Sequence, residues 1–354
     1  MPNLGSDPLV RRMALDLGLP GAGNCVEEIT EYALRIVERV IERSPFPVTD
    51  LELLQAILSN ALSVSIRYVD TDSDIDQIVS DFGNAHPCLA SQLHSDFVDG
   101  DTEGLLLALP NPEVWQTRHL AVIDRRGDQA NRANFTVWHE LAHLLTTPEQ
   151  LMLKELRRSP TMEAKAKDPI EQVTDHVAGL IAFYSPLFLP VFYREIGDSP
   201  VTFEAIERVR IAATPAASFQ STAMACVRAS QHPTLFVKIE PGLTARETRE
   251  QRSLQFQMML GAAVHAPTPK LRVAVTVKNA AAENTMLQIF KKMRVPENCV
   301  LKRVYDSSSE VEAAAREDQG WWETSSKGPL GRMALVVRGI RRGSHVYGLI
   351  SPLN

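Results

Sequence analysis

The sequence of 354 residues exceeds one ordinary domain, and at roughly 100 to 200 residues per domain it predicts two or three. Hydrophobic residues make up 44% and charged residues 23%, values that are typical of a folded globular protein and exclude a largely disordered or fibrous chain. Acidic residues outnumber basic ones by 43 to 37, and the net charge of −6 excludes a strong overall basic field that would attract nucleic acid.

The four cysteines indicate a reducing compartment. Cys25, Cys88, Cys226 and Cys299 form no CxxC pair, so neither a disulfide framework nor a thiolate zinc site is predicted. The N-terminus lacks the continuous apolar region of a secretory signal, and the most apolar segment, 179–193, contains two prolines and is shorter than a membrane span. We therefore expect a cytoplasmic protein without a membrane partner.

Apolar periodicity predicts the elements of the first half of the chain. Residues 70–104 show only weak periodicity, residues 149–168 are charged and are expected to cover the surface, and Pro186 is expected to end the last helix before a turn. The predicted elements are helices at 26–43 and 49–62, strands at 63–69, 105–109 and 119–124, a helix from about 134 to 145 and a helix at 169–184.

The second half begins with two predicted helices, 202–213 and 217–230, which are joined by a tight turn and resemble a helix-turn-helix in outline. Beyond them strands and helices alternate, which predicts a small α/β or α+β domain. The expected elements are strands at 234–239, 271–277, 299–305, 333–339 and 345–350 and helices at 244–260, 280–293 and 308–318.

The segment His139-Glu140-Leu141-Ala142-His143 is the most informative feature of the sequence. Residues i and i+4 lie on one face of a helix, so His139 and His143 can bind one metal ion while Glu140 points toward a metal-bound water. Zinc lowers the pKa of such a water to about 7, and Glu140 can accept its proton and pass it to a leaving amine. The spacing predicts a metallopeptidase with Zn²⁺, or another divalent ion such as Mn²⁺, as cofactor.

A catalytic zinc needs a third protein ligand, and the helix predicted from Pro169 offers three candidates. Glu171 and Asp175 are four residues apart and share a helix face, and His176 follows directly. Ligand chemistry alone does not choose between them.

The segment from Arg132 to Leu145, RANFTVWHELAHLL, resembles the ImmA/IrrE (PprI-like) family of metallopeptidases, whose helix carries an arginine, a Phe-Thr pair and the same motif in this order. The helix from Glu171, EQVTDHVAGLIAF, resembles the third-ligand helix of that family. The resemblance places the family's glutamate ligand on Asp175, with Glu171 and His176 as substitutes, and it covers roughly residues 26–240.

The resemblance implies an α+β fold with three parts. These are a zincin-like peptidase domain at residues 1–195, a helical helix-turn-helix-like module at 196–240, and a C-terminal α/β domain at 241–354. In that family the C-terminal domain resembles GAF sensor domains. It also implies site-specific cleavage of a helix-turn-helix repressor of the XRE type, which switches on a response to stress, DNA damage or a mobile element.

An alternative hypothesis is a non-proteolytic regulator that binds DNA or a repressor and whose metal site is structural. The helices at 202–230 motivate it. Their arginines Arg208, Arg210 and Arg228 are offset by Glu204 and Glu207, however, so a basic DNA-binding face is not predicted.

Overall fold

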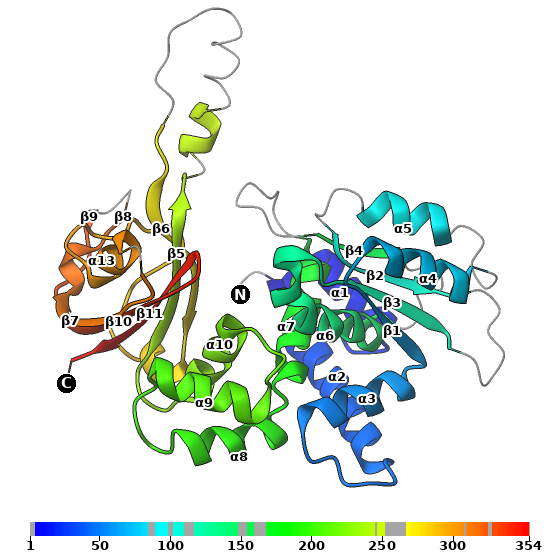
Figure 1. Ribbon diagram of the computed structural model, residues 1–354. Coiled ribbons are helices and arrows are strands. Elements are labelled where there is room, and N and C mark those ends of the chain that lie inside the picture. The colour runs from blue at the N-terminus through cyan, green and yellow to red at the C-terminus, as the bar shows by residue number, and fades with distance from the viewer. Residues whose placement is uncertain are drawn as a thin grey trace, which may run out of the picture. The chain divides into compact units, whose positions relative to one another are not determined.

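The computed structural model divides the chain into two compact units (Figure 1). We call Met1–Val191 with Arg210–Ser221 the N-terminal unit, and Phe192–Val209 with Thr222–Asn354 the C-terminal unit. The sequence suggested three consecutive parts. Its boundary at residue 195 lies close to Val191, where the first segment of the N-terminal unit ends, but its boundary at residue 240 falls inside the strand Leu235–Gly242. The described residues are 4–83, 89–97, 102–109, 117–147, 154–158, 168–244, 246–251, 267–307, 309–324 and 328–353.

The N-terminal unit is built around a mixed four-stranded sheet of order β1-β3-β2-β4, in which β1 and β3 are parallel and the other neighbours antiparallel. Its elements are η1 (Leu4–Ser6), α1 (Pro8–Asp16), α2 (Cys25–Glu42), α3 (Leu51–Ala61), β1 (Val64–Val69), α4 (Asp72–Phe82), α5 (Leu89–Phe97), β2 (Thr102–Ala108), β3 (His119–Asp124), η2 (Gly127–Gln129), α6 (Ala130–Thr146), β4 (Lys154–Arg158) and α7 (Pro169–Ala182).

Helices cover both faces of this sheet, which explains why its central strands are almost continuously apolar (Figure 1). Alternate residues of β2 face opposite ways, so that Leu105 and Leu107 pack with α4 and α5, whereas Leu106 packs with the helices that include α6 and α7. On β3, Leu120 and Val122 face the first group in the same way. The sheet is therefore a rigid layer behind α6.

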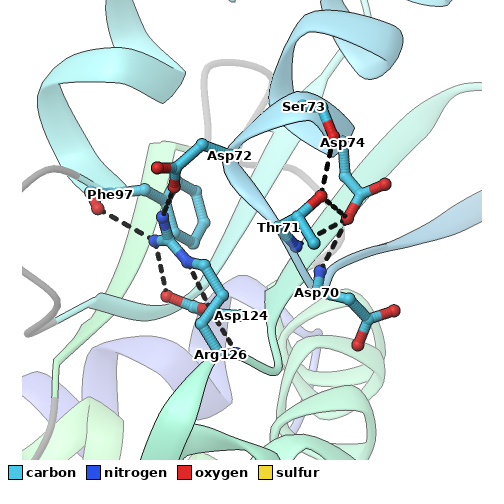
Figure 2. Close-up of polar contacts among 8 residues, drawn as sticks. All are labelled: Asp70, Thr71, Asp72, Ser73, Asp74, Phe97, Asp124 and Arg126. Carbon is cyan, nitrogen blue, oxygen red and sulfur yellow. Dashed lines mark hydrogen bonds and ion pairs between the residues drawn. The ribbon is translucent and has the colours of Figure 1, made fainter.

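Helices α4 and α5 lie in the segment whose periodicity is weak. A capping box marks the start of α4, since Asp74 accepts hydrogen bonds from the backbone N–H of Thr71 while the Thr71 side chain caps the helix. Figure 2 shows how Arg126 then joins three elements, donating to Asp72 of α4, Asp124 of β3 and the carbonyl of Phe97 at the end of α5. These contacts depend on tertiary structure and leave little trace in the apolar pattern.

Three further helices, α8 (Ser185–Glu195), α9 (Phe203–Ala213) and α10 (Phe219–Ala229), follow in the chain. The turn predicted after Pro186 is wrong, because α8 begins there and continues through Pro190. Pro186 lies in the first turn of α8, where a missing N–H costs nothing, and only Pro190 interrupts the backbone hydrogen bonds. Strand β4 lies within 149–168, where no strand was predicted.

The C-terminal unit contains a five-stranded sheet of order β6-β5-β11-β10-β7, in which all neighbours are antiparallel. Its elements are β5 (Leu235–Gly242), β6 (Lys270–Lys278), α12 (Ala280–Glu283), α13 (Val300–Asp306), β7 (Glu312–Asp318), η3 (Gln319–Trp321), β8 (Glu323–Thr324), β9 (Gly328–Pro329), β10 (Ala334–Arg342) and β11 (His345–Pro352). The predicted helix at 244–260 is helical over its described part, 246–251, and its remainder lies outside the described residues.

Three predictions for this unit are wrong. The predicted strand at 299–305 is α13, whose buried Val300, Leu301 and Val304 follow helical spacing, and the predicted helix at 308–318 contains β7. The alanines of β7 favour a helix intrinsically, but pairing with β10 along the whole strand overrides that preference. The predicted helix at 280–293 is helical only over α12. The unit is thus α+β with an antiparallel sheet rather than an alternating α/β domain.

No single helix among the described residues is long and apolar enough to cross a membrane. One bent pair, Pro169–Ile181 with Ser185–Glu195, passes a test of length and composition only.

Candidate metal centre

The predicted motif lies on α6 and presents both of its imidazoles to one point. His139 and His143 are four residues apart on the helix, their rings meet edge to face at 80°, and their Nε2 atoms are 3.0 Å apart. Both side chains are 1% exposed, because α6 packs between the sheet and α7. The apolar residues of the same helix, such as Val137 and Leu141, anchor it in the core and hold the imidazoles in place.

Helix α7 brings a carboxylate to the same point. The side chain of Asp168 accepts a hydrogen bond from the N–H of Ile170, and Pro169 occupies the first turn, so the helix begins at a fixed place. Glu171 therefore lies in the first turn of α7, with its Oε2 3.3 Å from Nε2 of His139 and its Oε1 3.3 Å from Nε2 of His143. His139, His143 and Glu171 form a group that could hold a metal ion.

The distances within this group fit a metal ion. For zinc–ligand distances near 2.0 Å, tetrahedral coordination separates two ligand atoms by about 3.3 Å. The two Nε2 atoms are 3.0 Å apart, and each lies 3.3 Å from a different oxygen of the Glu171 carboxylate, which is close to that value. Two imidazole nitrogens and one carboxylate oxygen are also a ligand set that zinc accepts in catalytic sites, which leave a fourth position open.

Asp175 lies beside this group on the opposite side of the His139 ring. Its Oδ1 is 2.9 Å from Nδ1 of His139, and because a carboxylate only accepts hydrogen bonds, Nδ1 carries the hydrogen and donates it. When the His139 ring is neutral, its Nε2 has a lone pair that can bind a cation. When the ring is protonated, Nε2 donates a hydrogen bond to the carboxylate of Glu171.

The three candidates for the third ligand therefore occupy different places. The Glu171 carboxylate lies beside the Nε2 atoms of both histidines. Asp175 accepts a hydrogen bond from Nδ1 of His139, and the side chain of His176 is exposed on α7. The sequence favoured Asp175 through the resemblance and kept Glu171 as a substitute. The geometry favours Glu171 for the metal and gives Asp175 the role of a hydrogen-bond partner, which the sequence reasoning missed.

The pKa of Glu171 reflects the charged groups and hydrogen-bond donors around it. Burial raises the pKa of this carboxyl group, but hydrogen bonds and charge interactions with His139 and His143 outweigh burial, so its pKa lies well below the ordinary value. Glu171 is accordingly ionised near neutral pH and ready to face a cation. His143 differs from His139 because its buried Nδ1 has no hydrogen-bond partner among the described residues.

The remaining motif residue, Glu140, is 1% exposed and lies where α6 packs against β2. Its carboxylate approaches Gly104, whose absent side chain leaves room for it. Sequence reasoning found Glu140 from the motif but missed Gly104. The signal that could have found it is a glycine inside a strand, directly before the apolar run at 105–107.

No protein-family model matches the sequence, and no curated protein matches it significantly. The likeness to the ImmA/IrrE metallopeptidases accordingly rests on the quoted residues of α6 and α7, and the function is argued from the geometry of those helices.

Proposed function

We propose that this protein is a zinc-dependent endopeptidase. The observation that carries the proposal is the convergence of Nε2 of His139, Nε2 of His143 and the carboxylate of Glu171 at tetrahedral spacing. The glutamate of the motif, Glu140, follows His139 directly on the same buried helix. Two histidines, a carboxylate and a second, catalytic glutamate make up the residue set of a metal-dependent hydrolase of peptide bonds.

Each residue has a separate role in this proposal. His139, His143 and Glu171 hold the ion, and Asp175 keeps the His139 ring in the tautomer that offers Nε2. Bound zinc supplies Lewis acidity, which activates a water molecule and polarises the carbonyl of the bond to be cleaved. Glu140 accepts the proton of that water on its carboxylate and delivers it to the leaving nitrogen. Mn²⁺ is an alternative ion for the same ligands.

We propose a helix-turn-helix repressor in the cytoplasm as the substrate. This part of the proposal is supported by the resemblance of the α6 and α7 sequences to the ImmA/IrrE family, whose members cleave such repressors. By the same resemblance, the N-terminal unit has a zincin-like fold, and the antiparallel sheet of the C-terminal unit belongs to a GAF-like sensor domain. Cleavage of the repressor then switches on a stress, DNA-damage or mobile-element response.

The alternative function is a non-proteolytic regulator that binds DNA or a repressor and has a structural metal site. Helix α10 gives DNA binding little support, because Arg228 is its only charged residue and most of its side chains are apolar or small. Structural zinc sites are closed by four protein ligands, whereas the group found among the described residues has three, His139, His143 and Glu171.

The test is cleavage of the repressor encoded beside this gene. Purified protein is loaded with zinc and incubated with the repressor, and mass spectrometry identifies any new N-terminus. We expect cleavage at one bond by the wild type and loss of at least about 10²-fold in rate for Glu140→Gln, since a general base contributes on that scale. Glu52→Gln, an exposed change on α3, is the matched control and should cleave normally.

Equal cleavage by the wild type and Glu140→Gln contradicts the proposed mechanism. Zinc binding without cleavage of any repressor, combined with zinc-dependent binding to it, supports the regulator instead.

A further inference from the structure

Gly104 lies in β2, between Ile123 of β3 and the neighbouring strand β4, on the side of the sheet that faces α6. A Cβ atom at this position would lie 2.5 Å from Cγ2 of Thr136 and 2.9 Å from Oε1 of Glu140. Both distances are well below the roughly 3.5 Å of a normal contact between non-bonded heavy atoms. The space that any other residue would fill is thus occupied by α6.

The lack of space for a side chain, and not the backbone conformation, explains why position 104 holds a glycine. Six described glycines have positive φ, and Gly104 is not among them, so other residues can adopt its backbone angles. Thr136 and Glu140 are four residues apart and project from the same face of α6, directly over β2. The glycine therefore lets the strand approach one helical turn that includes the catalytic glutamate.

The two neighbours of Gly104 would respond differently to an added methyl group. Thr136 is β-branched, completely buried, and hydrogen-bonded through its hydroxyl to the carbonyl of Arg132, so its methyl group cannot move aside. Oε1 of Glu140 is the end of a flexible side chain and can rotate away. A clash at Thr136 costs stability, whereas a clash at Glu140 displaces the carboxylate.

We propose that Gly104 is a positioning residue, whose missing side chain lets the Glu140 carboxylate lie against β2 in the place from which it transfers the proton. The role in proton transfer rests on the proposed peptidase function. The position of the carboxylate is a property of the fold and does not depend on that function. A displacement of about 1 Å at a catalytic group can cost about 10²-fold in rate, which sets the scale of the effect.

The experiment separates the two contacts with four variants: Gly104→Ala, Thr136→Ser, their combination, and Gly179→Ala. Thr136→Ser removes the methyl group that lies 2.5 Å from the added Cβ and keeps the hydroxyl, so it relieves the clash in packing but leaves the clash with Glu140. Gly179→Ala is the control, because, apart from its chain neighbours and the backbone of its own helix, no heavy atom of the described residues lies within 4 Å of its added Cβ. Melting temperature, zinc affinity, kcat and KM for the repressor are measured, and a crystal structure of the metal-free double variant is determined.

We expect Gly104→Ala to lower the melting temperature and the double variant to recover it. The double variant should bind zinc like the wild type and keep its KM, while kcat stays about 10²-fold low and the Glu140 carboxylate is displaced from β2. Normal kcat in the double variant, or an unmoved carboxylate in its crystal structure, overturns the proposal. If the wild type cleaves nothing, the peptidase function and the catalytic role fall together, and the crystal structure alone decides whether Gly104 positions the carboxylate.

Discussion

Two buried carboxylates of the N-terminal unit and one of the C-terminal unit differ in their partners. In the N-terminal unit, Glu103 is paired with Arg132 at 2.7 Å and Asp124 with Arg126 at 2.8 Å. In the C-terminal unit, Glu317 is also buried, but one of its oxygens accepts the backbone N–H of Val300 and the other has no hydrogen-bond partner among the described residues.

The consequence is a difference in the direction of the pKa shifts. Burial raises the pKa of Glu317, and its neighbour Cys299 has a raised thiol pKa because of burial and of Glu317 itself. Glu171 is partly buried as well, yet the two imidazoles lower its pKa. Burial alone thus raises the pKa of a carboxyl group, whereas positive charge or hydrogen-bond donors nearby lower it and favour the ionised form that binds a cation.

The largest expected effect comes from removing the carboxylate that meets the imidazoles. In Glu171→Ala, zinc binding measured by isothermal titration should be lost, because the group keeps two imidazole ligands and loses its carboxylate ligand. His143→Ala should behave in the same way. Zinc binding by Glu171→Ala with wild-type affinity would remove Glu171 from the site and return the third ligand to Asp175.

The second-largest effect is expected from a change that leaves the buried Asp124, like Glu317, without an ion-pair partner among the described residues. Arg126→Ala removes the guanidinium that binds Asp124, and we expect a loss of about 3 kcal/mol in the free energy of unfolding, because a buried charge loses its partner. The cluster is shown in Figure 2. Urea unfolding followed by circular dichroism measures the loss.

The neighbouring Arg125 is the matched control for that experiment. It pairs with Asp70 and lies over the ring of Tyr68, but both charged groups are largely exposed. Arg125→Ala should cost about 1 kcal/mol or less. Equal losses of unfolding free energy in Arg125→Ala and Arg126→Ala would mean that the burial of Asp124 does not increase the cost of removing its partner.

A smaller effect is expected from a change in Asp175, which accepts a hydrogen bond from Nδ1 of His139. Asp175→Asn keeps the size of the side chain but replaces a carboxylate acceptor by an amide, so zinc affinity should fall by about 10- to 100-fold without being lost. Competition with a colorimetric chelator measures this change. Complete loss of zinc in Asp175→Asn, with binding retained in Glu171→Ala, would reverse the roles assigned to these residues.

The smallest effect concerns the pH dependence of Glu317. Its pKa in the folded protein lies above the unfolded value of 4.5, so the folded state holds the proton more tightly. The stability it contributes is complete below pH 4.5 and is lost as the pH rises through the folded pKa. Glu317→Gln should remove this part of the pH dependence in urea unfolding, whereas the exposed Glu312→Gln on the same strand should not.

The sequence predicted the helix of the metal motif, the helix from Pro169 and the strands behind them, since each has a clear apolar period or a cap. It did not decide between Glu171 and Asp175. Both lie on one face of α7, and the choice depends on how far α7 is shifted along α6, which is a tertiary quantity. In the C-terminal unit, the alanines of β7 misled the prediction for a similar reason, because their strand is imposed by pairing with β10.

The residues that we propose as metal ligands, His139, His143 and Glu171, come from two helices of a single unit, and under this proposal metal supply is linked to folding. A ligand that binds only the folded state adds about 2.7 kcal/mol of stability when its free concentration is 100 times its dissociation constant. A zinc-starved cell would thus hold more of this unit in open forms that proteases can attack. Protein abundance, and not only catalytic rate, would then follow the free zinc concentration.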